Sequence, residues 1–158
     1  MNLKAEALNN LTVTEAFFNR STRCLVEEDS VFRPAPERMT VADHVAHAAQ
    51  VIDWFREGAL NDTWRMDFEA MQAETAKVTS LTAARTWFAQ AMARMREAIQ
   101  AANVDELATT MAENPILPGR PRVHVVEAIM DHTGHHRGAL AVYARLCGRV
   151  PEMPYGED

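Results

Sequence analysis

The chain has 158 residues, the size of one domain, and 47% of them are hydrophobic, an ordinary share for a globular protein. With 16 basic and 22 acidic side chains its formal net charge is −6, so the basic surface that nucleic-acid binding needs is not expected. No stretch reaches the roughly 18 apolar residues of a membrane span, and the start, MNLKAEALNN, lacks the apolar core of a signal peptide. We therefore expect one soluble, cytoplasmic domain over residues 1–158, with no nucleic-acid or membrane partner.

Four segments show the apolar spacing of amphipathic helices, and two of them lie in the first half of the chain. The first helix is predicted from about Thr14 to Asp29, with Thr14 as its N-cap. The second is predicted from about Thr40 to Ala59. Thr40 suits its N-cap, and Gly58 and Asn61 mark its end.

The third helix is predicted from about Ser80, its N-cap, to Ala102, and the fourth from about Arg122 to Leu146. Residues 61–79 and 103–121 are connections, the second with a short helical turn near Asp105–Met111. Both exceed the 2–8 residues that are usual between bundle helices, and long connections let non-adjacent corners of a bundle be joined. No segment shows the alternation of a β-strand, so the sequence predicts an all-helical fold.

The two cysteines, Cys24 and Cys147, lie far apart in the sequence and form no CxxC pair. Two buried thiols in a reducing compartment are the simpler interpretation. A disulfide between the first and last helices stays open as the alternative.

All six histidines fall in the second and fourth predicted helices. In the fourth helix, inward-facing residues recur at steps of three or four, as on the face that a bundle helix turns to its neighbours. This stripe consists of Val125, Ile129, His132, His136, Leu140 and Tyr143. Residues spaced i, i+4 project from one helix face about 5–6 Å apart at Cβ, so the imidazoles of His132 and His136 can share one metal ion.

A pair of core histidines satisfied by protein groups is the alternative to a metal site. Each buried polar group left without a partner costs about 1–3 kcal/mol, and a shared ion satisfies one nitrogen of each ring at once. The spacing of His132 and His136 therefore favours a metal site. His124 and His135 lie off the stripe and are expected to face solvent or a neighbouring helix.

Spacing leaves the third ligand open between His44 and His47. At about 100° per residue, the apolar arc of the second helix contains His44, whereas His47 lies toward its edge. The angle alone therefore favours His44 as the inward residue.

Two motifs resemble the DinB/YfiT-like superfamily. Residues 39–48, MTVADHVAHA, are similar to that family's second-helix motif. Residues 132–148, HTGHHRGALAVYARLCG, look like its C-terminal signature. The order and spacing of the predicted helices agree with the family along nearly the whole chain.

The resemblance implies an all-α four-helix bundle with up-down-down-up topology and long connections, usually a homodimer. It also implies one divalent transition metal, such as zinc, nickel or iron, on one histidine of the second helix and two of the fourth. In this chain those residues are His47, His132 and His136. The resemblance thus selects His47 where the helix angle favoured His44.

Three neutral imidazoles leave a coordination position open and leave the ion its full charge, which favours deprotonation of a bound water or thiol. Characterised relatives include thiol-dependent S-transferases and isomerases. The resemblance therefore implies a metal-dependent S-transferase, or a related hydrolase or isomerase, acting on a small molecule with a low-molecular-weight thiol. Asp43 and Asp131 are candidates to orient a ligating imidazole. The simpler interpretation is that both carboxylates are solvated.

Two other classes of protein fit the same sequence. One is a stress-associated binding or interaction module whose bound metal is structural or serves in sensing. The other is a metal-free helical dimerisation module. A pocket that leads to the histidines, lined by Trp54, Trp64 or Tyr143, would favour the enzyme, and a sealed site would favour a structural metal.

Overall fold

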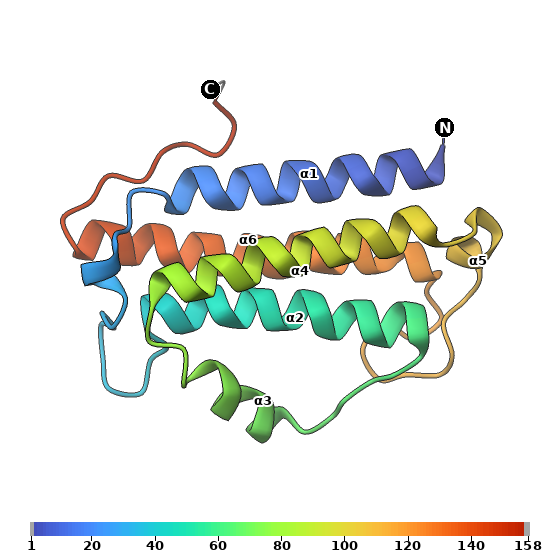
Figure 1. Ribbon diagram of the computed structural model, residues 1–158, viewed down its shortest axis with the longest axis horizontal. Coiled ribbons are helices and arrows are strands. Elements are labelled where there is room, and N and C mark those ends of the chain that lie inside the picture. Colours follow the sequence, from blue (N-terminus) through green and yellow to red (C-terminus); the bar gives the residue numbers. More distant parts are fainter. Residues whose placement is uncertain (1, 157–158) are drawn as a thin grey trace.

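Four long helices lie side by side in the computed structural model, which describes residues 2–156 (Figure 1). They are α1 (Leu3–Thr22), α2 (Val41–Asn61), α4 (Leu81–Ala101) and α6 (Val125–Leu146). The connections carry two short helices, α3 (Phe68–Thr75) and α5 (Val104–Ala108), and two 3₁₀ turns, η1 (Glu27–Asp29) and η2 (Arg122–His124). Residues 2–156 form no β-strand, so the predicted all-helical fold is confirmed. No helix within that range has an apolar stretch long enough to cross a membrane.

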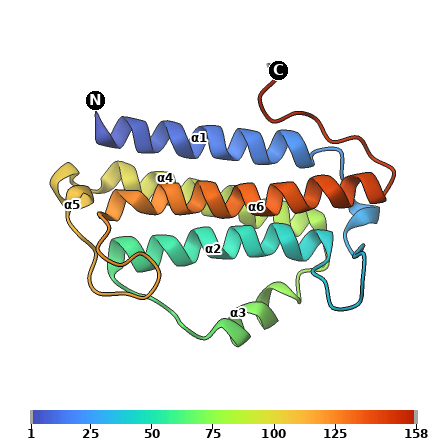
Figure 2. The same ribbon diagram turned by 180° about the vertical axis from the view of Figure 1, so that it is seen from behind.

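The directions of the helices account for the long connections. Helices α2 and α4 run the same way, opposite to α1 and α6 (Figures 1 and 2). Both α1 and α2 pack against α4 and α6. Because α2 and α4 are parallel neighbours, the chain that leaves α2 must return along the length of the bundle before α4 begins. Helix α3 forms in that return segment and lies on the outside of α2 (Figure 1).

Local capping chemistry accounts for the starts of α2 and α4. The Thr40 hydroxyl accepts a hydrogen bond from the Asp43 backbone N–H, and the Ser80 hydroxyl accepts one from Ala83. Both residues are the N-caps that the sequence predicts. The core between the helices is made of large apolar side chains, with Phe18 of α1 stacked on Phe88 of α4 at 4.3 Å between ring centroids.

The predicted bounds of the first helix are wrong. Helix α1 begins at Leu3, with Asn2 as its N-cap, and ends at Thr22, whereas residues 27–29 form a separate 3₁₀ turn. Thr14 is not a cap but an interior residue whose hydroxyl donates to the Asn10 carbonyl at 2.7 Å. A threonine inside a helix can bond in this way to the carbonyl four residues before it. Because threonine also favours N-cap positions, the sequence alone does not show which of the two places it occupies.

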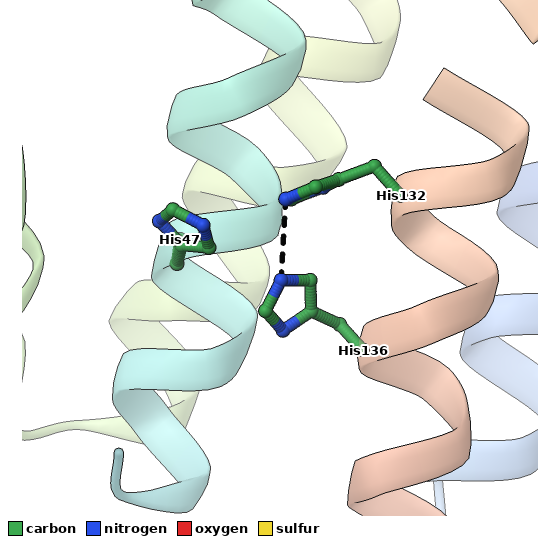
Figure 3. Close-up of side chains that lie close together, drawn as sticks. All are labelled: His47, His132 and His136. Atoms are coloured by element: carbon green, nitrogen blue, oxygen red, sulfur yellow. Dashed lines mark hydrogen bonds between the residues drawn. The ribbon is translucent and has the colours of Figure 1, made fainter. Parts of the chain in front are cut away.

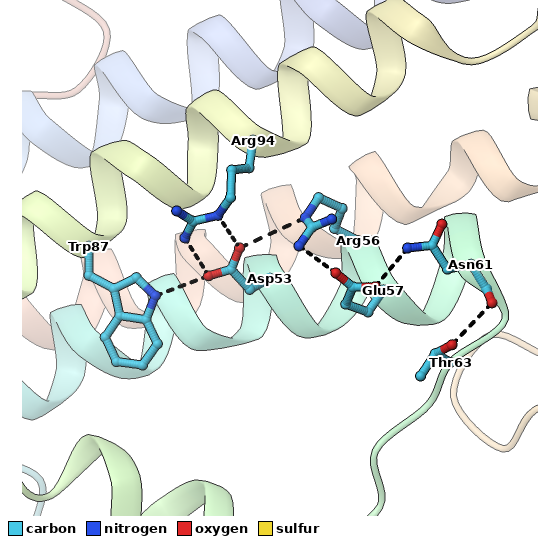
Figure 4. Close-up of polar contacts among 7 residues, drawn as sticks. All are labelled: Asp53, Arg56, Glu57, Asn61, Thr63, Trp87 and Arg94. Atoms are coloured by element: carbon cyan, nitrogen blue, oxygen red, sulfur yellow. Dashed lines mark hydrogen bonds and ion pairs between the residues drawn. The ribbon is translucent and has the colours of Figure 1, made fainter.

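Asp53 links α2 to α4, the most extensively packed pair of helices (Figure 4). Its carboxylate accepts hydrogen bonds from Nε and Nη2 of Arg94 at 2.9 and 2.7 Å, and from the indole N–H of Trp87 at 3.0 Å. A bidentate guanidinium–carboxylate pair has a fixed geometry, so these bonds specify the register of α2 against α4 more than they add stability.

Helix α2 ends at Asn61, one of the two residues predicted to mark its end, and closes at Asp62, which has a left-handed φ of 53°. Gly58, the other, lies within the last turn of the helix. The glycine admits the indole ring of Trp64, since a Cβ at this position would lie 2.4 Å from ring atoms. Gly58 therefore lets the return segment pack closely on α2.

Replacing Gly58 with alanine is expected to destabilise the protein by about 1–3 kcal/mol, because the methyl group displaces Trp64. The matched control is Gly138→Ala in α6, where no atom lies within 4 Å of the added Cβ. That variant should be up to about 1 kcal/mol more stable, because alanine is the better helix former. Urea unfolding measures both. Stabilisation by both substitutions would contradict a close contact at Gly58.

Candidate metal centre

Helices α2 and α6 pack against each other and bring three histidines together (Figure 3). His47 comes from α2, and His132 and His136 come from successive turns of α6. One nitrogen of each ring can be chosen so that all three atoms lie within 4.8 Å of one another. Among the described residues, this is the group of histidine, cysteine and acidic side chains whose atoms are close enough to hold a metal ion.

The inward stripe predicted for α6 is the face that the helix buries. Val125, Ile129 and Leu140 are fully buried, and the two histidines follow the same row. His136 is buried and His132 half-buried, with their Nε2 atoms 3.2 Å apart. The i, i+4 spacing therefore places both imidazoles on one face, as the sequence predicted.

His47 faces both α6 histidines from the opposite helix. Its ring centroid lies 5.1 Å from that of His132 and 5.0 Å from that of His136. His47 is half-buried, which fits its place at the edge of the apolar arc. A residue at the edge of the apolar arc of α2 can still contact the α6 histidines, because α6 packs alongside α2.

His44 also points toward α6, but it lies on the other side of His136. Its Nδ1 is 2.9 Å from Nδ1 of His136, and its ring stands edge-on to Tyr143 at 5.0 Å. With Nδ1 of His136 bonded to His44, Nε2 of His136 is the nitrogen directed at His132. The helix angle was therefore right that His44 is inward, and the sequence signal for its contact with His136 was its place inside the apolar arc.

Burial keeps this cluster uncharged. Desolvation lowers the pKa of His44 and of His132 to about 4, with repulsion from neighbouring imidazoles adding to it. The same two causes hold the pKa of His136 far below its ordinary value, and burial also lowers that of His47. At neutral pH each ring is therefore neutral and has a lone pair available for a metal ion.

Asp43 lies one turn before His47 on α2 and is buried, and its Oδ1 has no hydrogen-bond partner in the structure. The charge of this carboxylate raises the pKa of His47, against the larger effect of burial. A ligating histidine commonly donates its second ring N–H to a carboxylate. The unpartnered oxygen of Asp43 therefore fits a metal-bound His47, whereas Asp131 is exposed.

The remaining histidines and the cysteines lie outside the cluster of ligand atoms. His135 is exposed, and His124 pairs with Glu127 at 3.2 Å. Cys24 and Cys147 are free thiols, and burial raises the pKa of both. Neither cysteine is therefore an activated thiolate, so thiol chemistry at this site needs a thiol from outside the chain.

A cavity of about 380 Å³ opens beside the cluster. Its lining consists of Met39, His47, Val51, Trp54, Phe55, Phe68, Met71, Gln72, Thr75 and His132. Of the three residues expected to line such a pocket, Trp54 does so. Trp64 instead covers Gly58, and Tyr143 packs against His44. The histidines are therefore reachable from outside rather than sealed in the core.

Comparisons with known proteins agree with the helical architecture. The family model of the DinB superfamily matches residues 10–140. The crystal structure of a DinB-like protein from Bacillus cereus ATCC 10987 superposes with a TM-score of 0.70 at 20% sequence identity, covering 96% of this chain and 95% of that one. No curated protein matches the chain.

Proposed function

Because the chain belongs to the DinB superfamily, we propose that it is a divalent-metal-dependent enzyme whose ion is held by His47, His132 and His136. The observation that carries the proposal is the meeting of three neutral imidazoles from two helices beside an open cavity, which His47 and His132 line. Imidazole suits zinc, nickel and iron, which are the candidate ions. A structural metal is usually closed by four protein ligands, and an open cavity beside three ligands speaks against that alternative.

Bound at three imidazoles, a divalent ion has a position left for a substrate atom and lowers the pKa of a water or thiol there. We infer thiol S-transfer, or hydrolysis or isomerisation of a thiol conjugate, as the reaction class, with a low-molecular-weight thiol as one partner. In the protein, His44 would hold the ring of His136 and Asp43 would hold the ring of His47. The homodimer and the cytoplasmic location expected from the sequence stay predictions.

Elemental analysis of untagged protein, followed by a screen of thiols with small electrophiles, tests the proposed function. The expected result is near one transition-metal ion per chain and turnover that needs both metal and thiol. A protein with no affinity for zinc, nickel or iron would refute it. A protein that binds metal but turns over no thiol substrate would favour the binding or sensing module.

The contact between His44 and His136 gives a separate prediction. His44→Phe keeps a ring against Tyr143 but leaves Nδ1 of His136 without its partner, so metal affinity should fall about 10- to 100-fold. His135→Phe is the matched control, because His135 is exposed and its edge-on ring contact with His136, at 5.1 Å between centroids, can be kept by phenylalanine. The affinity of this variant should be unchanged. Competition with a chromogenic chelator measures both. Equal affinities in the two variants would show that His44 does not orient His136.

A further inference from the structure

The cavity beside the histidines is apolar and lacks formal charge. Its walls are Val51, Trp54 and Phe55 from α2, together with Phe68 and Met71 from α3, and its lining includes no lysine, arginine, aspartate or glutamate. Apart from the imidazoles, the polar lining side chains are those of Gln72 and Thr75. The Thr75 hydroxyl already donates to the Gln72 carbonyl at 3.2 Å. A charged group that entered would lose its hydration and gain no ionic partner.

Three aromatic rings give the cavity a defined shape. The Trp54 indole donates to the Arg65 carbonyl at 2.7 Å, which fixes the ring. Its centroid lies 5.3 Å from that of Phe55 and 5.9 Å from that of Phe68. Phe68 is nevertheless 53% exposed, although it lines the cavity. An apolar ligand group placed here would remove this exposed ring surface from water.

The size of the cavity limits the ligand. A cavity of about 150 Å³ is enough for benzene, so about 380 Å³ holds a ring with a short substituent. His47 and His132 lie in its lining, and both belong to the three-histidine group. A ring against Trp54 and Phe68 can therefore carry a donor atom toward the histidines.

We infer that this cavity binds an uncharged aromatic group of the substrate, with a sulfur or oxygen of the same molecule directed at His47 and His132. The inference deepens the proposed function and rests on it for the metal contact, whereas the recognition of the ring depends on the cavity alone. Low-molecular-weight thiol cofactors are polar, so the cavity takes the apolar group that is transferred, and the polar body of the thiol stays outside.

Binding to the metal-free protein tests the recognition of the ring. Benzyl alcohol should shift the Trp54 indole signal in a ¹H–¹⁵N spectrum until it saturates. The signal of Trp87 should stay in place, because its N–H is bonded to Asp53 at 3.0 Å and it does not line the cavity. 2-Mercaptoethanesulfonate, which is charged and has no ring, should bind at least about tenfold more weakly. No saturable shift of Trp54, or equal affinity for both probes, overturns the inference.

A pair of exposed positions supplies the variant and its control. Phe68→Ala should weaken benzyl alcohol binding about five- to tenfold, because one aromatic wall is lost. Val142→Ala removes an apolar side chain that is 55% exposed on α6, outside the cavity, and should leave the affinity unchanged. An equal loss in both variants, or none in Phe68→Ala, contradicts the assignment of the wall.

A zinc-loaded sample separates this inference from the proposed function. Benzyl mercaptan should bind there at least about tenfold more tightly than benzyl alcohol, because its sulfur reaches the ion. If the protein takes up no metal but benzyl alcohol still shifts Trp54, the cavity assignment stands and the metal enzyme fails. If metal binds and Trp54 does not respond to either ring compound, the cavity assignment fails and the metal site stands.

Discussion

Replacing His132 and His136 with alanine together abolishes metal binding in the expected experiment, from near one ion per chain to none. The two residues supply two of the three imidazoles whose nitrogens lie within 4.8 Å of one another, so the variant retains only His47. One imidazole cannot hold a divalent ion against water, and the affinity should fall about a thousandfold or more. Elemental analysis and calorimetric titration with zinc measure the loss.

The matched control for this double variant removes the two other histidines in the C-terminal part of the chain, His124 and His135. His124→Ala with His135→Ala changes one residue paired to Glu127 and one exposed residue, and should keep the full metal content. Circular dichroism should show both double variants helical, since the buried apolar side chains of all four long helices are unchanged. Retention of one ion per chain after loss of His132 and His136 would refute the site.

The metal-free protein should lose stability as the pH falls from about 6.5 toward 4. The pKa of His44 is about 4 in the folded protein against 6.5 for the free side chain, and burial is the main cause. Between these values the unfolded chain binds more protons than the folded one, so the free energy of unfolding rises with pH. The stability is full above 6.5 and is lost as acid protonates the unfolded chain, by on the order of 3 kcal/mol for His44 alone.

Urea unfolding in the presence of a chelator, at several pH values between 7.5 and 4, measures this loss. His44→Phe should flatten the slope, because one buried titrating ring is removed, and thus separates the histidines from other groups. The carboxyl groups of Asp29 and Asp62 have lowered pKa values and so add their own loss below about pH 4. A flat profile between pH 6.5 and 4.5, or the same slope in His44→Phe, would contradict the buried, uncharged cluster.

Local features of the chain could be predicted from the sequence because they depend on neighbours within one or two turns. Thr40 and Ser80 cap helices through bonds to residues three positions on. The i, i+4 spacing of His132 and His136 fixes two imidazoles on one face of any helix that contains them. The prediction failed at Thr14 because a threonine that caps a helix and one inside it differ only in whether the preceding residues are helical.

The relation between elements was decided by the tertiary structure. Whether His44 or His47 completes the group with α6 depends on how α2 is rotated about its axis and how closely α6 packs against it. The angular position of a residue on α2 gives neither the rotation nor the distance between the two helices. The packing of the core and the bonds of Asp53 to Arg94 set that rotation. Both histidines turn out to face His136, from two sides.

The sequence by itself determined the helical fold, the face of α6 and the kind of ligand that the face presents, because periodicity and residue chemistry are properties of the chain. The cavity, in contrast, was decided by the tertiary structure. Its wall from α3 is a segment that the sequence placed in a connection, and it meets Trp54 and His132 only after the chain has crossed back over α2. Such a surface exists only when segments distant in the sequence are packed together, since its shape is set by the separation of the helices.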